Sequence, residues 1–404
     1  MNYLVLDPSV FIFKEDGKVL LYNSTDGEKI FSTEKDVLNL FEKKLHNQNI
    51  IEINNEQIKN LIIINLIRDI FNKNMGYLNC ECLIPPFQIS PMLNIQNEEG
   101  SGVELLDNSN NLLINIRELS LFLNGSIFLT DDNDVLKQTL FTLGKVSDCE
   151  LDYLKTEQFV LPILLAKSLF KVNLIGYNIL KYKYIHNIIN LFYDLRNEIL
   201  LSCYIDIQHY IELSDSLEIF NAYENCKFII CINDLSKIDY ILRNNQNLYA
   251  DKSVFHCLVH NEEDYNISKK LEDAGYNVKF IPIFNGKNET FFKENIFIDE
   301  NDILSSCPTQ NEIFNNMKLN SNFFGKLYIL PNGIVYTNLN FSPIGSVNNH
   351  ATEIVSKEFK KGESWFLTRR KVSPCSKCLF CDICPPISNY EIVFNKFDLC
   401  NLEK

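Results

Sequence analysis

Residues 228–259 read FIICINDLSKIDYILRNNQNLYADKSVFHCLV. Two short apolar runs, Phe228–Ile232 and Ser253–Val259, flank a helical stretch, Leu235–Asn245. Short apolar strands that alternate with helices favour parallel βαβ units, because helices then cover both faces of the sheet. This stretch therefore predicts an α/β fold.

The alternation extends over residues 112–290, which we expect to form one domain. The other strand candidates are Glu118–Leu129, Val172–Ile179, Ile199–Ile207 and Asn277–Ile283. The other helical stretches are Glu157–Phe170, Tyr182–Asn197, Ile211–Tyr223 and Glu262–Ala274. Six strand–helix repeats predict a partial (β/α)6 barrel rather than the full eight. Its open side needs a cover, and a large peptide substrate or a partner protein is one candidate.

The C-terminal section, residues 291–404, contains the most specific motif in the chain. Residues 374–384 read PCSKCLFCDIC, and Cys400 follows after fifteen further residues. Thiolates at two-residue spacing direct several sulfur atoms at one centre, as in sites for soft metals and iron–sulfur clusters. We expect a metal site here, and a reduced cysteine-rich loop without metal is the alternative.

The redox compartment decides between metal and disulfides. The N-terminal residues MNYLVLDPSVFIFKED lack the basic start, long apolar core and small-residue cleavage site of a secretion signal. No apolar run approaches the roughly 20 residues that a membrane span needs. We therefore expect a cytoplasmic protein, in which paired thiols stay reduced and favour metal over disulfides.

Composition argues against nucleic acid as a partner. The 404-residue chain is 46% hydrophobic, which is ample for a large core and two or three domains. Its formal net charge of −14 would repel a phosphate backbone. A short basic stretch near the C-terminus is interpreted as a solvated face broken by acidic residues. Its basic residues are Lys357, Lys360, Lys361, Arg369, Arg370, Lys371 and Lys377.

Residues 1–79 follow a different pattern. Three strand-like runs, Val10–Phe13, Val19–Tyr22 and Lys29–Phe31, precede two amphipathic helical runs, Glu34–Leu45 and Ile58–Phe71. This order predicts a small winged-helix-like module, which often offers a strand edge and a helix groove to an extended peptide. A simple cap on the larger domain is an equally good interpretation. Residues 80–111 are a connector, because prolines and a polar run break the periodicity.

If the N-terminal module binds a peptide, we expect its binding residues on the strand edge and on the facing helix. The candidates are Lys29, Ile30, Phe31, Leu66 and Ile70. Other residues with reactive side chains receive simpler interpretations. His256 and His260 fall on or just after a strand and are interpreted as packing or solvated residues rather than metal ligands. Four cysteines in or beside apolar strands are interpreted as buried small hydrophobic residues: Cys203, Cys226, Cys231 and Cys257.

Six strands followed by a cysteine-rich section resemble the radical SAM peptide-modifying enzymes that carry a SPASM extension. Three segments are similar to the hairpin that opens a SPASM domain: Phe324–Leu327, Pro331–Gly333 and Ile344–Gly345. The pattern Cys375-x2-Cys378-x5-Cys384-x15-Cys400 is similar to its closing cysteines. Residues 384–391, CPPISNYE, resemble the ending of peptide-maturase SPASM domains. Residues 1–79 resemble the RiPP recognition element, a module that binds leader peptides.

The loop after the first predicted barrel strand departs from that family. In radical SAM enzymes this loop carries Cys-x3-Cys-x2-Cys, which holds the cluster that cleaves S-adenosylmethionine. The matching positions here are Ser126, Thr130 and Asn133, and the motif occurs nowhere in the chain. Hydroxyl and amide groups are poor ligands for an iron–sulfur cluster. We therefore expect no functional S-adenosylmethionine cluster and no radical SAM chemistry.

The chain is best matched by the pseudo-radical-SAM (pseudo-rSAM) proteins, which are encoded beside active radical SAM/SPASM peptide maturases and double-glycine precursor peptides. Residues 3–12, YLVLDPSVFI, and residues 20–24, LLYNS, resemble the N-terminus of that family. Residues 174–178, LIGYN, stand where active relatives carry a Gly-Gly-Glu motif that contacts S-adenosylmethionine. One glycine, Gly176, remains, and the acid is absent.

The resemblance implies one 4Fe–4S cluster in the C-terminal section. A full SPASM domain has further cysteines near its hairpin, but Asn338 stands where one is expected, which leaves one four-thiolate site at most. Its ligands would be four of the five cysteines, with Cys381 as a substitute. The first choice is Cys375, Cys378, Cys384 and Cys400. Four thiolates suit a closed structural zinc site equally well, so zinc is the alternative.

Two functions remain open. The first is a non-catalytic accessory protein of ribosomal peptide maturation, which binds the precursor (leader) peptide, partners an active radical SAM/SPASM maturase, or does both. The second is a redox or peptide-modifying enzyme that uses the C-terminal iron–sulfur cluster. The first predicts no cleavage of S-adenosylmethionine after cluster reconstitution. The second requires turnover of a substrate by the isolated chain.

Overall fold

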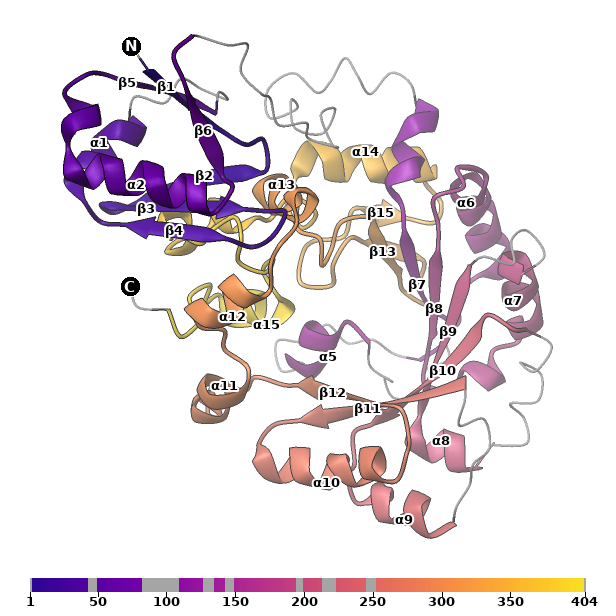
Figure 1. The fold of residues 1–404 in the computed structure, drawn as a ribbon. Coiled ribbons are helices and arrows are strands. Elements are labelled where there is room, and N and C mark those ends of the chain that lie inside the picture. The colour runs from indigo at the N-terminus through magenta and orange to yellow at the C-terminus, as the bar shows by residue number, and fades with distance from the viewer. Residues whose placement is uncertain are drawn as a thin grey trace.

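The computed structural model describes residues 2–42, 49–81, 109–125, 134–141, 149–193, 199–212, 223–244 and 252–402. These residues form a mixed α/β protein with one nine-stranded sheet and two three-stranded sheets (Figure 1). The large sheet, called the main sheet below, is mostly parallel, with the strand order β12-β11-β10-β9-β8-β7-β13-β14-β15. The prediction of an α/β fold is confirmed.

Six parallel strands follow one another in chain order across the main sheet, at the six predicted positions. They are β7 (Glu118–Phe122), β8 (Lys171–Ile175), β9 (Leu200–Asp206), β10 (Cys226–Ile232), β11 (Ser253–Val259) and β12 (Val278–Pro282). The first strand is shorter than the predicted Glu118–Leu129. It ends at Phe122, and Gly125 has a φ of +100°, a conformation that does not continue a strand.

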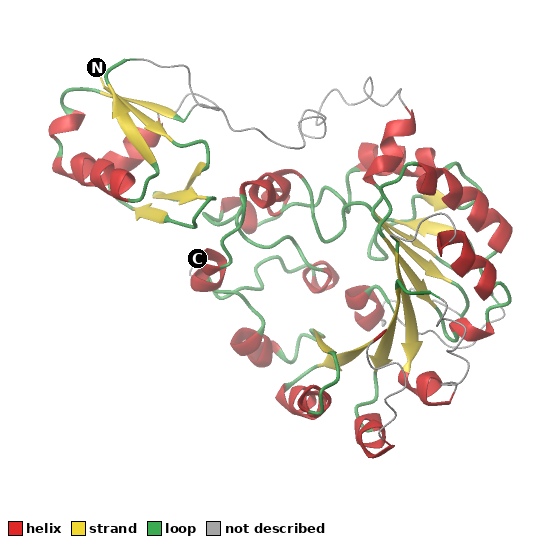
Figure 2. Ribbon diagram, turned by 45° about the vertical axis from the view of Figure 1, so that its right-hand side comes forward, coloured by secondary structure: helices red, strands yellow, loops and turns green. Residues whose placement is uncertain are grey.

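The two faces of the main sheet are covered differently. Helices lie on the outer face: α6 (Tyr153–Leu165), α7 (Ile185–Tyr193), α8 (Ile207–Glu212), α9 (Lys237–Asn244) and α10 (Glu262–Asp273) (Figure 2). Outward residues such as Leu121 and Leu174 form a single apolar core with this layer. On the inner face, α5 (Asp134–Thr139) packs Leu136 against the alternate strand residue Phe122. Alternation along each strand therefore supplies both layers.

Several helices begin at other residues than predicted, and at two of them a polar side chain that caps the helix sets the first residue. The predicted run Ile58–Phe71 is divided at Asn60, whose side chain accepts a hydrogen bond from Ile62 N; α2 therefore covers Leu61–Asn72. Asp152 caps α6 through Lys155 N, so that helix starts at Tyr153. Both shifts are set by a side chain that satisfies a free backbone N–H at the helix start.

The main sheet continues into the C-terminal section. Strand β13 (Lys326–Ile329) pairs parallel with β7, and β14 (Ile334–Tyr336) and β15 (Gly345–Ser346) follow antiparallel. The predicted hairpin is present, and its turn is made at Gly333, where φ is +77°. Strands from both sides of the expected boundary at residue 290 thus share one sheet. The remaining C-terminal helices are α11 (Glu289–Asn295), α12 (Glu300–Ser305), α13 (Gln310–Lys318), α14 (Ala351–Lys361) and α15 (Asn389–Phe394).

The N-terminal module contains two sheets. The predicted runs form the sheet β2-β3-β4, from Val10–Glu15, Lys18–Asn23 and Lys29–Ser32. Its first turn is Asp16-Gly17, with φ values of +43° and +74°, which suit a two-residue hairpin. The helices are α1 (Lys35–Glu42) and α2. The sheet β5-β1-β6 was not predicted, because its short strands pair with distant segments: Ile50–Ile53, Asn2–Leu6 and Gly76–Asn79.

The β2–β4 sheet is buried on both faces. Val19 and Leu21 face α1 and α2, whereas the alternate residues Leu20 and Tyr22 pack against the C-terminal section. The Tyr22 hydroxyl donates a hydrogen bond to Pro308 O at 3.1 Å. The N-terminal module therefore packs directly on the cysteine-rich section, through β2 and β3. Among the described helices, none is long and apolar enough to cross a membrane.

Candidate metal centre

Five C-terminal cysteines line a single cavity of about 730 Å³, called the cysteine cavity below. They are Cys375, Cys378, Cys381, Cys384 and Cys400. The N-terminal module supplies another part of the lining, from the β2–β3 turn and from Phe31 of β4. The structure thus brings the predicted ligands to one place, although Cys400 is distant in the chain.

Successive tight turns hold the first four cysteines. Cys378 N donates to Cys375 O at 2.9 Å, and Cys381 N donates to Cys378 O at 3.0 Å. Cys384 N donates to Phe380 O at 2.8 Å. Because the segment turns back at each step, all four cysteines reach the lining of the cavity, whereas a strand would send alternate side chains to opposite faces.

Side chains from other elements fix the ends of this segment. From α13, Asn316 Nδ2 donates to Cys384 O at 3.2 Å. Next to Cys400, Asn401 Nδ2 donates to Lys293 O at 2.7 Å and to Phe297 O at 3.1 Å. Amide side chains therefore anchor both approaches to the cavity.

A buried arginine stands beside the thiols. Arg369 is 9% exposed, and its Nη1 lies 3.5 Å from Cys375 Sγ. The same guanidinium donates to both oxygens of Glu391, at 3.0 and 3.4 Å, and to Pro385 O at 2.5 Å. Glu391 is 2% exposed and also accepts from Ser388 N, which caps α15. This ion pair ties the cysteine segment to α15.

The interpretation of the basic stretch as a solvated face is therefore wrong for Arg369, because its charge is paired inside the protein. Its neighbour Arg370 is also paired: two hydrogen bonds of 2.5 and 2.6 Å join it to Asp382, which is 5% exposed. Sequence reasoning missed both pairs. The available signal was the position of two arginines just before a cysteine run that needs countercharge.

The thiols differ in their charged neighbours. Burial raises the pKa of Cys375 and raises that of Cys384 to about 12, and the Arg369 guanidinium opposes burial at both. Burial also raises the pKa of Cys381 to about 12, but there the largest charge effect is the Asp382 carboxylate, which raises it further. Cys381 therefore has a different electrostatic environment from Cys375 and Cys384.

The donor type, a set of thiols, is the type that soft metals and iron–sulfur clusters prefer. Among the residues that the structure describes, no three His, Cys, Asp or Glu side chains are grouped so that they could hold a metal ion. However, five thiols surround one cavity, soft metals deprotonate thiols on binding, and Arg369 would offset part of the thiolate charge. Four of the five cysteines would hold the group, which would act as an electron carrier if it is iron–sulfur and as a structural cross-link if it is zinc.

The carboxyl ends of β7 and β8 carry amides. Asn124 Nδ2 donates to Asn178 O at 2.7 Å, and Asn178 N donates to Asn124 Oδ1 at 3.2 Å. Between them, a Cβ on Gly176 would lie 2.5 Å from Asn124 Oδ1, so only glycine fits there. The two loops are thus bonded to one another. The three predicted positions of the lost cluster, Ser126, Thr130 and Asn133, lie outside the described residues.

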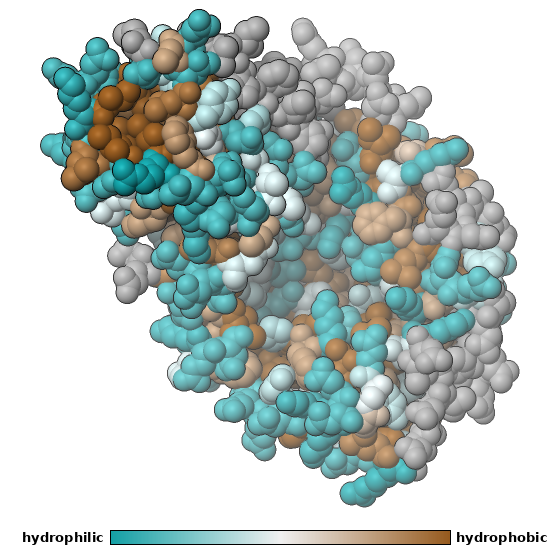
Figure 3. Space-filling view, in the orientation of Figure 1, coloured by the Kyte–Doolittle hydropathy of each residue, from teal (hydrophilic) through white to brown (hydrophobic). Residues whose placement is uncertain are grey.

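The five candidate peptide-binding residues divide into two groups. Ile30, Leu66 and Ile70 are buried in the core of the N-terminal module. Lys29 is exposed, and Phe31 is 51% exposed and lines the cysteine cavity. The module also has exposed apolar side chains on α2, and Figure 3 shows an apolar patch on this part of the molecule.

The main-sheet cysteines are buried as expected, and His256 and His260 have ordinary packing and polar neighbours. The four cysteines of the main sheet are at most 2% exposed. His256 is 7% exposed and packs near the rings of Phe141 and Tyr204. His260 Nδ1 lies 3.1 Å from Asp264 Oδ2. These side chains form no metal site among the described residues.

No protein family matches the chain. No curated protein matches it significantly either.

Proposed function

We propose that this chain is a pseudo-rSAM accessory protein of ribosomal peptide maturation. It binds a precursor (leader) peptide, partners an active radical SAM/SPASM maturase, or does both, and it does not cleave S-adenosylmethionine. In this proposal the six consecutive parallel strands are a degenerate radical-SAM-like partial barrel. The β13–β14 hairpin and the cysteine cavity are the SPASM-like section, which carries one 4Fe–4S cluster, with zinc as the alternative.

The observation that carries the proposal is where the possible metal ligands lie: the thiols line the cysteine cavity, and the ends of β7 and β8 carry amides. At the carboxyl ends of β7 and β8, where an active relative would bind S-adenosylmethionine, the Asn124 side-chain amide bonds to the backbone of Asn178. Thiols instead gather in the cysteine cavity, against the N-terminal module. A soft metal would therefore be held far along the chain from the loops that would need it for radical chemistry. This arrangement supports binding rather than catalysis.

The N-terminal module offers a place for the peptide. Strand β4 is at the edge of the β2-β3-β4 sheet, and its Phe31 faces the cysteine cavity. An extended peptide could add a fourth strand beside β4, with backbone hydrogen bonds for affinity and side-chain contacts for specificity. Glu15, Asp16 and Lys18 would lie beside such a peptide. This placement replaces Leu66 and Ile70, whose buried side chains would not reach it.

The first experiment tests the absence of radical chemistry. The full chain is purified anaerobically, reconstituted with iron and sulfide, and incubated with S-adenosylmethionine and a strong reductant. We expect no cleavage of S-adenosylmethionine, and we expect co-purification with the maturase encoded beside it. Cleavage by the chain alone would contradict the accessory role, and turnover of another substrate would favour the redox-enzyme alternative.

The second experiment tests the peptide site with matched variants. Phe31→Ala should weaken leader-peptide affinity about tenfold, because an exposed aromatic anchor is lost from a binding edge. Phe170→Ala is the control, because Phe170 is equally exposed at 53% but lies at the start of β8. Fluorescence anisotropy with a labelled leader peptide gives both affinities. Equal affinities for the two variants would exclude β4 as the binding edge.

A further inference from the structure

The inner face of the main sheet contains a second cavity, of about 390 Å³, which the proposed function does not use. Residues of six parallel strands, β7, β8, β9, β11, β12 and β13, line it, and α5 and the start of α15 complete it. Cavities of this size accept small organic ligands. Asn322, Ser388 and Tyr390 line both this cavity and the cysteine cavity, so the two are neighbours. We call it the inner cavity.

The inner cavity has an excess of positive charge. Glu118 is its one acidic lining residue, and Lys171 and Lys326 stand 3.3 and 3.5 Å from its carboxylate oxygens. Asn173 Nδ2 donates to the same carboxylate at 2.6 Å. Lys279 also lines the cavity and forms no salt bridge with a described residue. Three lysines and one carboxylate leave a surplus of two positive charges, in a chain whose net charge is −14.

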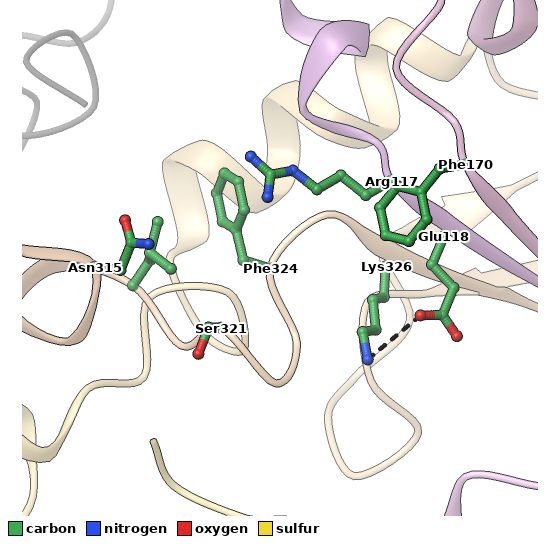
Figure 4. Close-up of a pocket in the computed structure, with 8 residues that line it drawn as sticks. Arg117, Glu118, Phe170, Asn315, Ser321, Phe324 and Lys326 are labelled. Carbon is green, nitrogen blue, oxygen red and sulfur yellow. Dashed lines mark ion pairs between the residues drawn. The ribbon is translucent and has the colours of Figure 1, made fainter. Parts of the chain in front are cut away.

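Glu118 is ionised, so its negative charge offsets one of the three lysines in this sum. Burial raises the pKa of Glu118, but the charges of Lys326 and Lys171 and the Asn173 hydrogen bond lower it below its ordinary value overall. Figure 4 shows the Glu118–Lys326 ion pair from a smaller pocket of about 140 Å³, which shares both residues with the inner cavity. The Glu118–Lys326 pair thus separates the smaller pocket from the inner cavity. Because Lys171 and Lys326 are already paired with Glu118, Lys279 is the lysine that can pair with a ligand.

Two buried polar atoms in the inner cavity lack a hydrogen-bond partner among the described residues. They are Asn173 Oδ1 and His256 Nδ1, on side chains that are 3% and 7% exposed. Buried polar atoms are nearly always paired, so each unpaired atom indicates a missing group. Burial, with help from Lys279 and Lys171, lowers the pKa of His256 to about 3, so its ring is neutral at pH 7. Asn173 Oδ1 needs an N–H or O–H donor.

We propose that the inner cavity binds a small organic carboxylate that also carries an N–H donor. The carboxylate pairs with Lys279 and approaches Lys171 and Lys326, and the N–H donates to Asn173 Oδ1. Apolar lining residues such as Phe141 and Ile281 cover the remainder of the ligand. A free α-amino acid and the carboxyl end of a peptide share this chemistry. The proposal does not depend on a bound cluster or on the accessory role.

The test measures binding to the full chain by isothermal titration calorimetry. The probes are leucine, N-acetyl-leucine, which represents a peptide end, and N-acetyl-leucinamide, which lacks the carboxylate. We expect saturable binding of at least one carboxylate and at least tenfold weaker binding of the amide, because the neutral amide cannot pair with the charge of Lys279. Tighter binding of leucine assigns a free amino acid as the ligand, and tighter binding of N-acetyl-leucine assigns a chain end.

Variants locate the binding. Lys279→Gln should weaken carboxylate binding at least tenfold, and Lys269→Gln, on the exposed side of α10, should leave it unchanged. Lys279 is an exposed residue of the edge strand β12, so its loss should leave the thermal midpoint within a few degrees of the wild type. The proposal is overturned if no carboxylate binds, if the amide binds as tightly as the acid, or if Lys279→Gln retains full affinity.

Discussion

The main sheet and the cysteine cavity both bury thiols, but they surround them with different groups. In the sheet, Cys203 and Cys226 lie 3.7 Å apart among apolar side chains. Burial raises the pKa of Cys203 far above its ordinary value, and no charged neighbour opposes it. In the cysteine cavity, Arg369 stands 3.5 Å from Cys375 and acts against burial. The same residue type is thus a neutral core residue in one region and a candidate ligand in the other.

This difference comes from local backbone structure as much as from composition. A strand sends successive side chains to opposite faces, so the sheet cysteines are dispersed through the core. Tight turns that repeat every three residues instead bring Cys375, Cys378 and Cys381 to the lining of one cavity. Clustered thiols can hold a metal more easily where a buried cation such as Arg369 offsets their charge. The comparison between the main sheet and the cysteine cavity can therefore be tested by substituting the arginine, a buried histidine and the two kinds of cysteine.

The largest expected effect comes from removing that cation. Arg369→Ala should lower the free energy of unfolding by about 3–5 kcal/mol, because it leaves Glu391 buried without a partner. Urea denaturation of the full chain measures this loss. The control, Arg243→Ala on the exposed side of α9, should remain within about 0.5 kcal/mol of wild type. A loss for Arg369→Ala no larger than that of the control would show that the pair does not hold the cavity together.

Acid should destabilise the sheet through His256. Its pKa is about 3 in the folded protein and 6.5 in the reference state, so the unfolded chain binds the proton more readily below pH 6.5. Stability should therefore fall as the pH drops from about 6.5 towards 3, with a loss of about 3 kcal/mol at pH 4. His256→Gln should remove this part of the pH dependence, and His186→Gln on the exposed side of α7 should retain it. If stability depended on pH in the same way in both variants, His256 would not be the source of the acid destabilisation.

A smaller effect should separate the two kinds of cysteine. Cys203→Ser places a hydroxyl in the apolar core and should cost about 1–3 kcal/mol in urea denaturation. Cys381→Ser changes a partly exposed thiol and should cost less. Both variants should lose less metal than a variant in which a first-choice ligand such as Cys375 is replaced by serine. A Cys203→Ser variant that loses its metal would contradict the division into core and ligand cysteines.

Much of this fold could be predicted from the sequence, because its strands are short apolar runs separated by helical stretches. The six parallel strands, the Asp16-Gly17 turn and the C-terminal hairpin all carry local signals. The extension of the main sheet by β13 carries none, because it pairs with β7, which is distant in the chain. The sheet β5-β1-β6 was missed for the same reason.

The candidate sites divide in the same way. The gathering of the cysteines could be predicted from their spacing, whereas the Arg369–Glu391 pair could not, because its partners are 22 residues apart and look like surface charges. The burial of Leu66 and Ile70 depends on which face of α2 meets the sheets. The inner cavity has no local signal either. Glu118 and Asn173 are polar residues within largely apolar strands, and only the parallel register brings them together.

The central claim is that the cysteine cavity holds the metal of this protein and the sheet cysteines do not. The most direct measurement is the iron, sulfide and zinc content of anaerobically purified wild type, of the Cys375→Ser/Cys384→Ser variant and of Cys203→Ser. We predict about four irons and four sulfides per wild-type chain, complete loss in the double variant and retention in Cys203→Ser. Zinc alone in the wild type would contradict the iron–sulfur assignment, and metal retained in the double variant would contradict the site itself.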